Sequence, residues 1–177
     1  MLGFAGCSLE NKSEENSTMD LDPNLEAALR ESLDRDEGPL ISEDWALLEQ
    51  ARFLGRSIEN LEGFQQAANL RELNLRRNEI SDLAPLSALP HLETLILADN
   101  KIADISRLNG DVLSSLRHLD LSINEIDDLT ALDWDCLENL SHLDIRYNYI
   151  SLQDEAVAGL IHELVSRGVE VLAEPMY

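Results

Sequence analysis

Basic residues are scarce in this chain. Its 177 residues include 13 lysines and arginines against 35 aspartates and glutamates, which gives a formal net charge of −22, and Lys12 and Lys101 are the only lysines. Nucleic acids and anionic membranes are bound through clusters of basic side chains. A chain this acidic therefore argues against both as direct partners, although its charge does not name a positive partner.

Cysteines and long apolar runs are also few. Cys7 and Cys136 are too few for a disulfide framework, and no stretch approaches the length of a membrane-spanning helix. Cys136 falls at an apolar position of the repeated pattern described below, so we expect a buried free thiol. The sequence has no glycine-rich phosphate loop and no serine, histidine and acid set typical of a nucleophile. We therefore predict that the chain is not an enzyme and needs no cofactor.

Leucines recur at a nearly fixed spacing through the middle of the chain. Segment 70–83, LRELNLRRNEISDL, fits the pattern L-x-x-L-x-L-x-x-N-x-L. The pattern returns at Leu92, Leu116 and Leu140, and a worn copy begins at Leu48, so successive copies start 22 or 24 residues apart. A single match would be weak evidence, but four full copies and one degenerate copy indicate a leucine-rich repeat.

The pattern predicts one short strand per repeat. In L-x-L the two leucines fall on one face of a strand, and only stacking of successive repeats can bury them. An asparagine at each turn out of the strand can bond the backbone groups that the turn leaves unpaired. These asparagines are Asn78, Asn100, Asn124 and Asn148. The predicted fold class is an α/β solenoid with a parallel concave β-sheet, a convex side of short 3₁₀ turns, and helical caps at both ends.

Polar residues mark the convex turns, and helices mark both ends. The candidate turn caps are Asn60, Asp82, Asp104 and Asp128. Asp22 is a natural N-cap for a helix over 22–33. A second helix is predicted over 151–167, starting at Ser151 and ending at Gly168 in the left-handed conformation.

These elements divide the chain into two parts. Residues 1–19 are polar and acidic after their first few residues and read as a disordered tether. Residues 20–177 form the predicted repeat domain, with an N-terminal cap over 20–47, repeats over 48–150 and a C-terminal cap over 151–177. We expect this single domain to be a monomer.

Cys7 suggests how the chain could reach a membrane. Phe4-Ala5-Gly6-Cys7 resembles a bacterial lipobox, whose cysteine becomes the lipidated first residue of a lipoprotein. Only six residues precede Cys7, whereas a signal peptide needs about 15–30. If the true start lies further upstream, Cys7 is a lipid anchor at the cell envelope; otherwise the segment is a frayed cytoplasmic N-terminus.

The chain resembles bacterial leucine-rich repeat proteins of the internalin type, including lipoproteins with short repeat arrays. The resemblance rests on segments 22–33, 38–50 and 150–175 and on the repeats with N-x-I-x-D-L, and it covers about residues 20–177. It implies a scaffold that binds a protein partner, here at a bacterial cell envelope. Similar short repeats in eukaryotic phosphatase-regulator-like proteins imply an alternative, a cytoplasmic regulatory subunit that docks on an enzyme. A polysaccharide-binding module is a third reading, disfavoured because Tyr147 is the one clear concave aromatic.

The concave face is the predicted place for a partner. Arginines gather at its N-terminal end, and apolar side chains occur in a row that should face solvent, as at a binding surface. The candidate contact residues are Arg52, Asn74, Arg76, Arg77, Ile96, Asp99, His118, Asp120, Ile123, His142, Asp144, Arg146 and Tyr147.

Four of these residues offer a metal site as a weaker alternative. His118 and His142 occupy the same position in adjacent repeats, as do Asp120 and Asp144. Neighbouring strands lie roughly 4.8 Å apart, so the four side chains could form a compact square. Two imidazoles and two carboxylates could hold a divalent ion, whereas the simpler reading is an ordinary polar patch.

Overall fold

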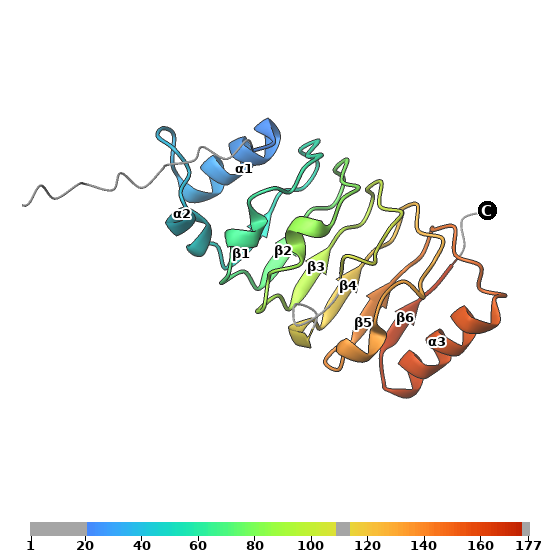
Figure 1. The fold of residues 1–177 in the computed structure, drawn as a ribbon. Coiled ribbons are helices and arrows are strands. Elements are labelled where there is room, and N and C mark those ends of the chain that lie inside the picture. Colours follow the sequence, from blue (N-terminus) through green and yellow to red (C-terminus); the bar gives the residue numbers. More distant parts are fainter. Residues whose placement is uncertain (1–20, 109–113, 175–177) are drawn as a thin grey trace, which may run out of the picture.

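A computed structural model describes residues 21–108 and 114–174, so the predicted tether and Cys7 lie outside the described ranges. Six parallel strands form one open sheet in chain order (Figure 1). The strands are β1 (Gln50–Arg52), β2 (Glu72–Asn74), β3 (Thr94–Ile96), β4 (His118–Asp120), β5 (His142–Asp144) and β6 (Glu170–Leu172). The α/β solenoid predicted from the leucine spacing is confirmed, and its strands fall where L-x-L places them.

The core runs the length of the array. The middle residue of every strand from β1 to β5 points inward, and these side chains are at most 1% exposed: Ala51, Leu73, Leu95, Leu119 and Leu143. Because each strand has only three residues, no repeat buries its leucines alone, and the core depends on the neighbours above and below.

Asparagines join each repeat to the one before it. Asn124 is 2% exposed, and its Nδ2 donates to Leu97 O and Leu121 O, each at 3.0 Å. Its Oδ1 accepts from Ile102 N at 3.1 Å. The same backward contacts recur at Asn78, Asn100 and Asn148. The prediction that the asparagine column satisfies turn backbone is therefore confirmed.

A column of left-handed residues lies directly before the asparagines and, in the first repeat, directly before Arg56. The sequence pattern does not reveal it, because the side chains have nothing in common: Gly55, Arg77, Asp99, Ile123 and Tyr147, with φ between 55° and 63°. Each backbone N–H in the column bonds the next repeat, as Ile123 N does to Arg146 O at 2.9 Å. The ladder thus continues past the short strands.

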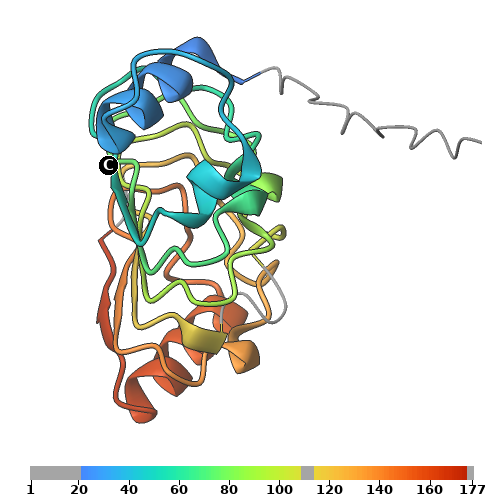
Figure 2. The same ribbon diagram turned by 90° about the vertical axis from the view of Figure 1, so that its left-hand side faces the viewer.

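Helices α1 (Pro23–Leu33) and α2 (Ser42–Ala46) close the N-terminal end (Figure 2). Asp22 caps α1 as predicted, and its second carboxylate oxygen accepts from the backbone N–H groups of Glu59 and Asn60. One carboxylate therefore ties the cap to the first loop. Helix α2 was not predicted, since five residues are too few for a helical periodicity.

The convex side carries the expected 3₁₀ turns, η1 (Phe64–Gln66), η2 (Ala84–Leu86) and η4 (Trp134–Cys136). In each predicted cap a side-chain oxygen accepts the N–H two residues later at 2.7–2.9 Å, which holds at Asn60, Asp82, Asp104 and Asp128. The prediction that Cys136 is buried was wrong, although its side chain is a thiol, as expected. Its side chain is partly exposed, with Sγ 3.3 Å from Asp133 Oδ2, because the 3₁₀ turn directs Trp134 into the core instead.

Helix α3 (Glu155–Ser166) covers the C-terminal end. It begins four residues later than predicted, because Asp154 rather than Ser151 accepts the first N–H groups. Its end is as predicted, with Gly168 at φ 89° and the N–H of Val169 bonded back to Leu164 O at 3.0 Å. No helix in the described ranges is long and apolar enough to cross a membrane.

Candidate functional site

The strands present two rows of side chains on the face opposite the core, which we call the open face. The strand register sets each row. One row is Gln50, Glu72, Thr94, His118, His142 and Glu170; the other is Arg52, Asn74, Ile96, Asp120, Asp144 and Leu172. The sequence prediction that His118 neighbours His142 and Asp120 neighbours Asp144 is confirmed.

The two histidines form a stacked pair. His142 Nδ1 lies 3.2 Å from Glu170 Oε2, so the next strand orients its ring. Burial and the charge of His142 lower the pKa of His118, while Asp120 and Asp144 raise it by a smaller amount. The pair therefore keeps His118 neutral to a lower pH than an ordinary histidine.

The two carboxylates turn away from the histidines toward other partners. Asp144 is 4% exposed, and its carboxylate accepts hydrogen bonds from Nε and Nη2 of Arg146. Nη2 lies 2.6 Å from Oδ2. Asp120 accepts from the backbone and hydroxyl of Ser122, at 3.0 and 2.7 Å. Among the described residues, no group of three or more histidine, cysteine, aspartate or glutamate side chains could hold a metal ion. The four side chains therefore form a polar patch, and we do not propose a metal site.

Arginines occupy the N-terminal end of the open face. Arg52 Nη2 lies 3.1 Å from Glu72 Oε2, and Arg77 Nε lies 3.5 Å from Asp99 Oδ2. These side chains are exposed, and exposed ion pairs contribute at most about 1 kcal/mol. Arg52, Asn74 and Ile96 also line a hollow of about 290 Å³ on this part of the face. A partner could exchange its own carboxylates for the intramolecular ones at little cost.

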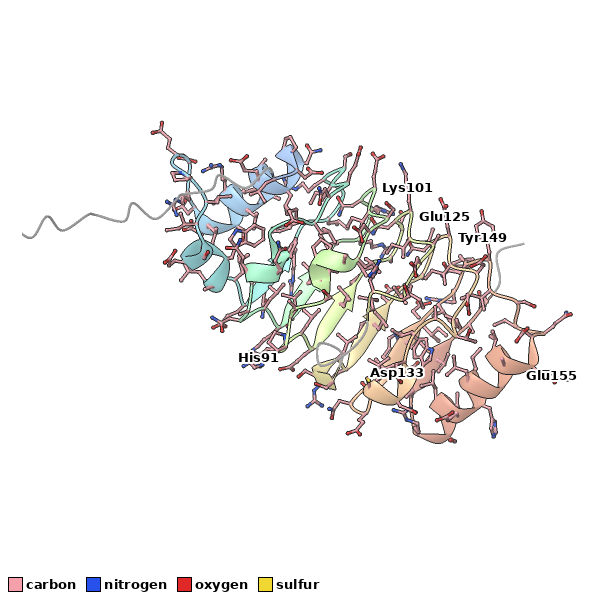
Figure 3. The ribbon with its side chains drawn as sticks, viewed as in Figure 1. His91, Lys101, Glu125, Asp133, Tyr149 and Glu155 are labelled. Carbon is pink, nitrogen blue, oxygen red and sulfur yellow. The ribbon has the colours of Figure 1, made fainter. Side chains whose placement is uncertain are left out.

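Apolar side chains are exposed at the other end. Ile123 and Tyr147 are 37% and 39% exposed and occupy the left-handed column in adjacent repeats. For a β-branched residue such as Ile123, positive φ is a strained backbone conformation. Tyr149 is also exposed and was not among the predicted residues. It follows its asparagine as Lys101 and Glu125 follow theirs, and the three lie in a row along one edge (Figure 3). Because Lys101 and Glu125 are charged, the position after the asparagine could have been recognised from the sequence as exposed, and Tyr149 with it.

The thirteen predicted contact residues divide between the strands and the turns that follow them. On the open face itself are Arg52, Asn74, Ile96, His118, Asp120, His142 and Asp144, and in the turns that follow the strands are Arg76, Arg77, Asp99, Ile123, Arg146 and Tyr147. Their geometry agrees with the sequence pattern, and their part in binding stays a prediction.

Comparison with known proteins defines the repeats. Family models described as "Leucine Rich repeats (2 copies)" and "Leucine rich repeat" match residues 68–110 and 90–150. The chain is a leucine-rich repeat protein. A mouse relative, leucine-rich repeat-containing protein 23, is 45% identical over 64 residues, which are 34% of this chain and 19% of the mouse protein. The chain therefore corresponds to a small part of that relative.

Two solved structures from Listeria monocytogenes share the fold. The internalin inlF has a TM-score of 0.67 at 22% identity, covering 87% of this chain and 51% of the internalin chain. The internalin inlC2 has a TM-score of 0.60 at 21% identity, covering 87% and 75%. This leucine-rich repeat protein thus has internalin-like structural neighbours. At this level of identity the likeness establishes the fold alone. Leucine-rich repeat domains are typically protein-interaction modules and are generally not enzymes.

Proposed function

We propose that this leucine-rich repeat protein binds another protein through its open face and the turns that follow the strands, at a bacterial cell envelope. The observation that carries the proposal is the exposed pair of Ile123 and Tyr147. Both are apolar, both are held at positive φ, and they neighbour each other because Ile123 N bonds Arg146 O. The other positions of the left-handed column hold Gly55, Arg77 and Asp99, so the two exposed hydrophobic side chains, rather than the shared conformation, set these two repeats apart.

The surroundings of this pair favour a protein partner. Interface cores combine aromatic and aliphatic side chains with arginine and with fewer acidic groups than the rest of the surface. The open face offers Ile96 and Arg52, and the turns that follow the strands add Ile123, Tyr147 and Arg77, in a chain whose net charge is −22. A polysaccharide would favour a series of stacked aromatics, and the strand positions carry none.

Capture from fractionated cells tests the proposal. Full-length protein, Ile123→Asp and Val165→Asp are immobilised and exposed to envelope and cytoplasmic extracts of the source cells. Val165 is the matched control because it is 53% exposed and apolar but lies on α3, away from the sheet. A protein captured by the parent and by Val165→Asp, and at least about tenfold less by Ile123→Asp, supports the open face. Equal capture by all three contradicts it.

Cys7 provides the test of location. Expression from the native upstream DNA, followed by fractionation and intact mass measurement, should give a membrane-bound product that begins at a lipidated Cys7. A soluble product that begins at Met1 overturns the envelope proposal.

The alternative is a cytoplasmic regulatory subunit that docks on an enzyme such as a phosphatase. The mouse relative is not a bacterial protein, so related repeats also occur outside bacterial envelopes. Capture of an enzyme from the cytoplasmic extract, with the same loss in Ile123→Asp, would support this alternative.

A further inference from the structure

Strand β1 has a free edge. On one side it pairs with β2. The carbonyl oxygen of Glu49 accepts from Arg71 N, and the N–H of Phe53 donates to Asn74 O, each at 2.8 Å. In a parallel ladder alternate residues bond to the same neighbour. The N–H and C=O groups of Gln50 and Arg52 therefore point away from the sheet. Within the described residues, no hydrogen bond from another segment reaches them.

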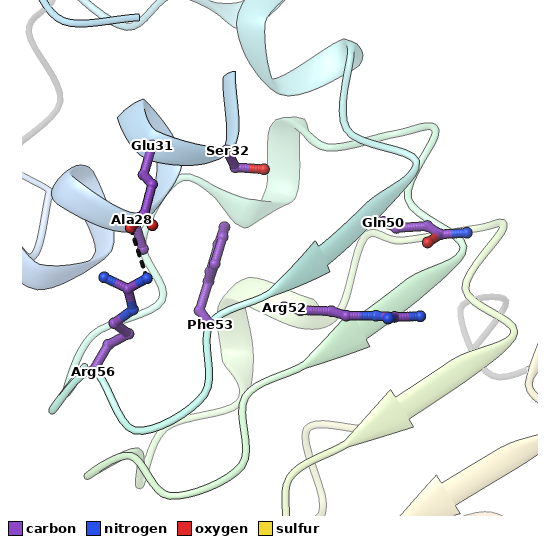
Figure 4. Close-up of a pocket in the computed structure, with 7 residues that line it drawn as sticks. All are labelled: Ala28, Glu31, Ser32, Gln50, Arg52, Phe53 and Arg56. Carbon is purple, nitrogen blue, oxygen red and sulfur yellow. Dashed lines mark hydrogen bonds and ion pairs between the residues drawn. The ribbon is translucent and has the colours of Figure 1, made fainter. Parts of the chain in front are cut away.

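A pocket of about 360 Å³ lies beside this edge. Figure 4 shows it between α1 and β1, with Phe53 between the helix and the strand. The pocket is lined by Ala28, Glu31, Ser32, Gln50, Arg52, Phe53 and Arg56. Because α1 presents the small residues Ala28 and Ser32 here, it leaves room beside the strand. Most folds cover or blunt such an edge, and here it opens onto a hollow.

The pocket carries more basic than acidic side chains, although the protein as a whole is acidic. Its lining includes Arg52 and Arg56 against one acidic residue, Glu31, in a chain whose net charge is −22. Arg52 and Arg56 are 70% and 43% exposed and are paired with the exposed carboxylates of Glu72 and Glu31. Such exposed pairs are weak, so a carboxylate brought by a ligand can replace either one.

We propose that the β1 edge and this pocket bind an extended acidic peptide segment of a partner protein. The segment adds as a further strand, accepting from and donating to the backbone of Gln50 and Arg52. A carboxylate of the segment lies against Arg52 or Arg56. This site goes beyond the open-face proposal, because it uses the edge of the sheet and requires neither Ile123 nor Tyr147.

Selection of peptides followed by amide hydrogen exchange tests the site. A random peptide display library is selected on the full chain, with counter-selection on the Arg52→Glu, Arg56→Glu double variant. We expect enriched peptides rich in aspartate and glutamate. Such a peptide should slow exchange of the Gln50 and Arg52 amides at least about tenfold, while the amides of Ala51 and Phe53, already bonded to β2, change little.

Charge variants give the matched control. Arg52→Glu and Arg56→Glu should each weaken peptide binding about tenfold or more. Arg107→Glu makes the same change of charge at an exposed position outside the pocket and should leave binding unchanged. Ile123→Asp should also leave it unchanged, so the failure of this site and of the open face are distinguishable.

Four results would overturn the proposal. One is a selection without acidic enrichment, and another is a peptide that protects residues elsewhere on the sheet. Protection of Gln50 and Arg52 already present in the free monomer would mean that this chain covers its own edge. A dimer whose formation protects the same amides would mean that the occupant is a second copy.

Discussion

The imidazole rings of His118 and His142 are stacked, with centroids 4.3 Å apart and planes 11° apart. Two protonated rings at this distance repel each other, and burial disfavours the charged form further. His142 faces Glu170, and the carboxylates of Asp120 and Asp144 only partly offset the lowering of the pKa of His118. The contact is therefore favourable while His118 is neutral and weakens when it gains a proton.

We predict that the histidine pair makes stability depend on pH. The pKa of His118 lies below its ordinary value of 6.5 in the folded protein, so the unfolded chain binds more protons between the two values. The stability that neutral His118 contributes is therefore complete above pH 6.5 and is lost as the pH falls through the folded pKa. Urea unfolding of the parent and of His118→Gln across this window should show a shallower pH dependence in the variant. Identical slopes would contradict the prediction.

Asn124 should be essential to the stability of the array. Asn124→Ala leaves the N–H of Ile102 buried without an acceptor. It also removes one of the two amide donors of Leu97 O and of Leu121 O, which keep Asn100 and Asn148 as donors, so we expect a cost of about 2 kcal/mol of unfolding free energy. Asn139→Ala is the control, because this exposed side chain makes a single bond to Ser114 O and should cost less than about 1 kcal/mol. Urea unfolding measures the free energy of unfolding of both variants. Equal losses would contradict the prediction that the buried asparagines stabilise the array more than an exposed asparagine does.

The left-handed column offers a stabilising change. Arg77 has φ 59° and is exposed, so Arg77→Asn places a residue that tolerates this conformation at the loss of one weak ion pair. We expect a gain of about 0.5–1 kcal/mol in unfolding free energy. Arg76→Asn is the control, since Arg76 is not among the residues with positive φ. The idea fails if the two variants have equal midpoints in urea.

Two glycines should respond to alanine in opposite directions. Gly63 has φ 106°, and a Cβ there would collide with the ring of Trp45 and lie 2.9 Å from Leu21 Cδ2. Gly63→Ala should cost roughly 3 kcal/mol and loosen the N-terminal cap. Gly159 lies in α3 with open space around it, so Gly159→Ala should gain about 0.5–1 kcal/mol. Thermal unfolding of both variants checks the pair, and a stable Gly63→Ala would mean that Trp45 can move.

The sequence predicted what depends on side-chain type at fixed spacing. Leu73 and Leu75 mark a strand because they must share a face, and Asn78 marks the turn because an amide can both donate and accept. Asp22 was recognisable as a cap because its carboxylate accepts the N–H groups left unpaired at the start of a helix. Each of these predictions rests on a residue whose chemistry leaves few alternatives.

The features that were missed depend on geometry between segments. Ile123 and Gly55 share the left-handed backbone conformation, which their two different residue types do not predict. The carboxylate of Asp144 binds Arg146 rather than His142, because the guanidinium of Arg146, two residues further along the chain, donates two hydrogen bonds to it. The pocket beside β1 depends on which residues α1 presents toward the strand, and no local sequence pattern sets how the helix docks.

The asparagine column also sets the order in which the repeats can be completed during synthesis. Asn124 lies 22 residues after Ile102, whose N–H it accepts, so the turn of one repeat is completed by the repeat that follows it. During synthesis the earlier repeat leaves the ribosome first and must wait for its successor. The hydrogen bonds of each turn therefore form only after the next repeat has been synthesised. A chain whose synthesis stops within the repeats keeps one turn whose backbone N–H lacks its asparagine acceptor.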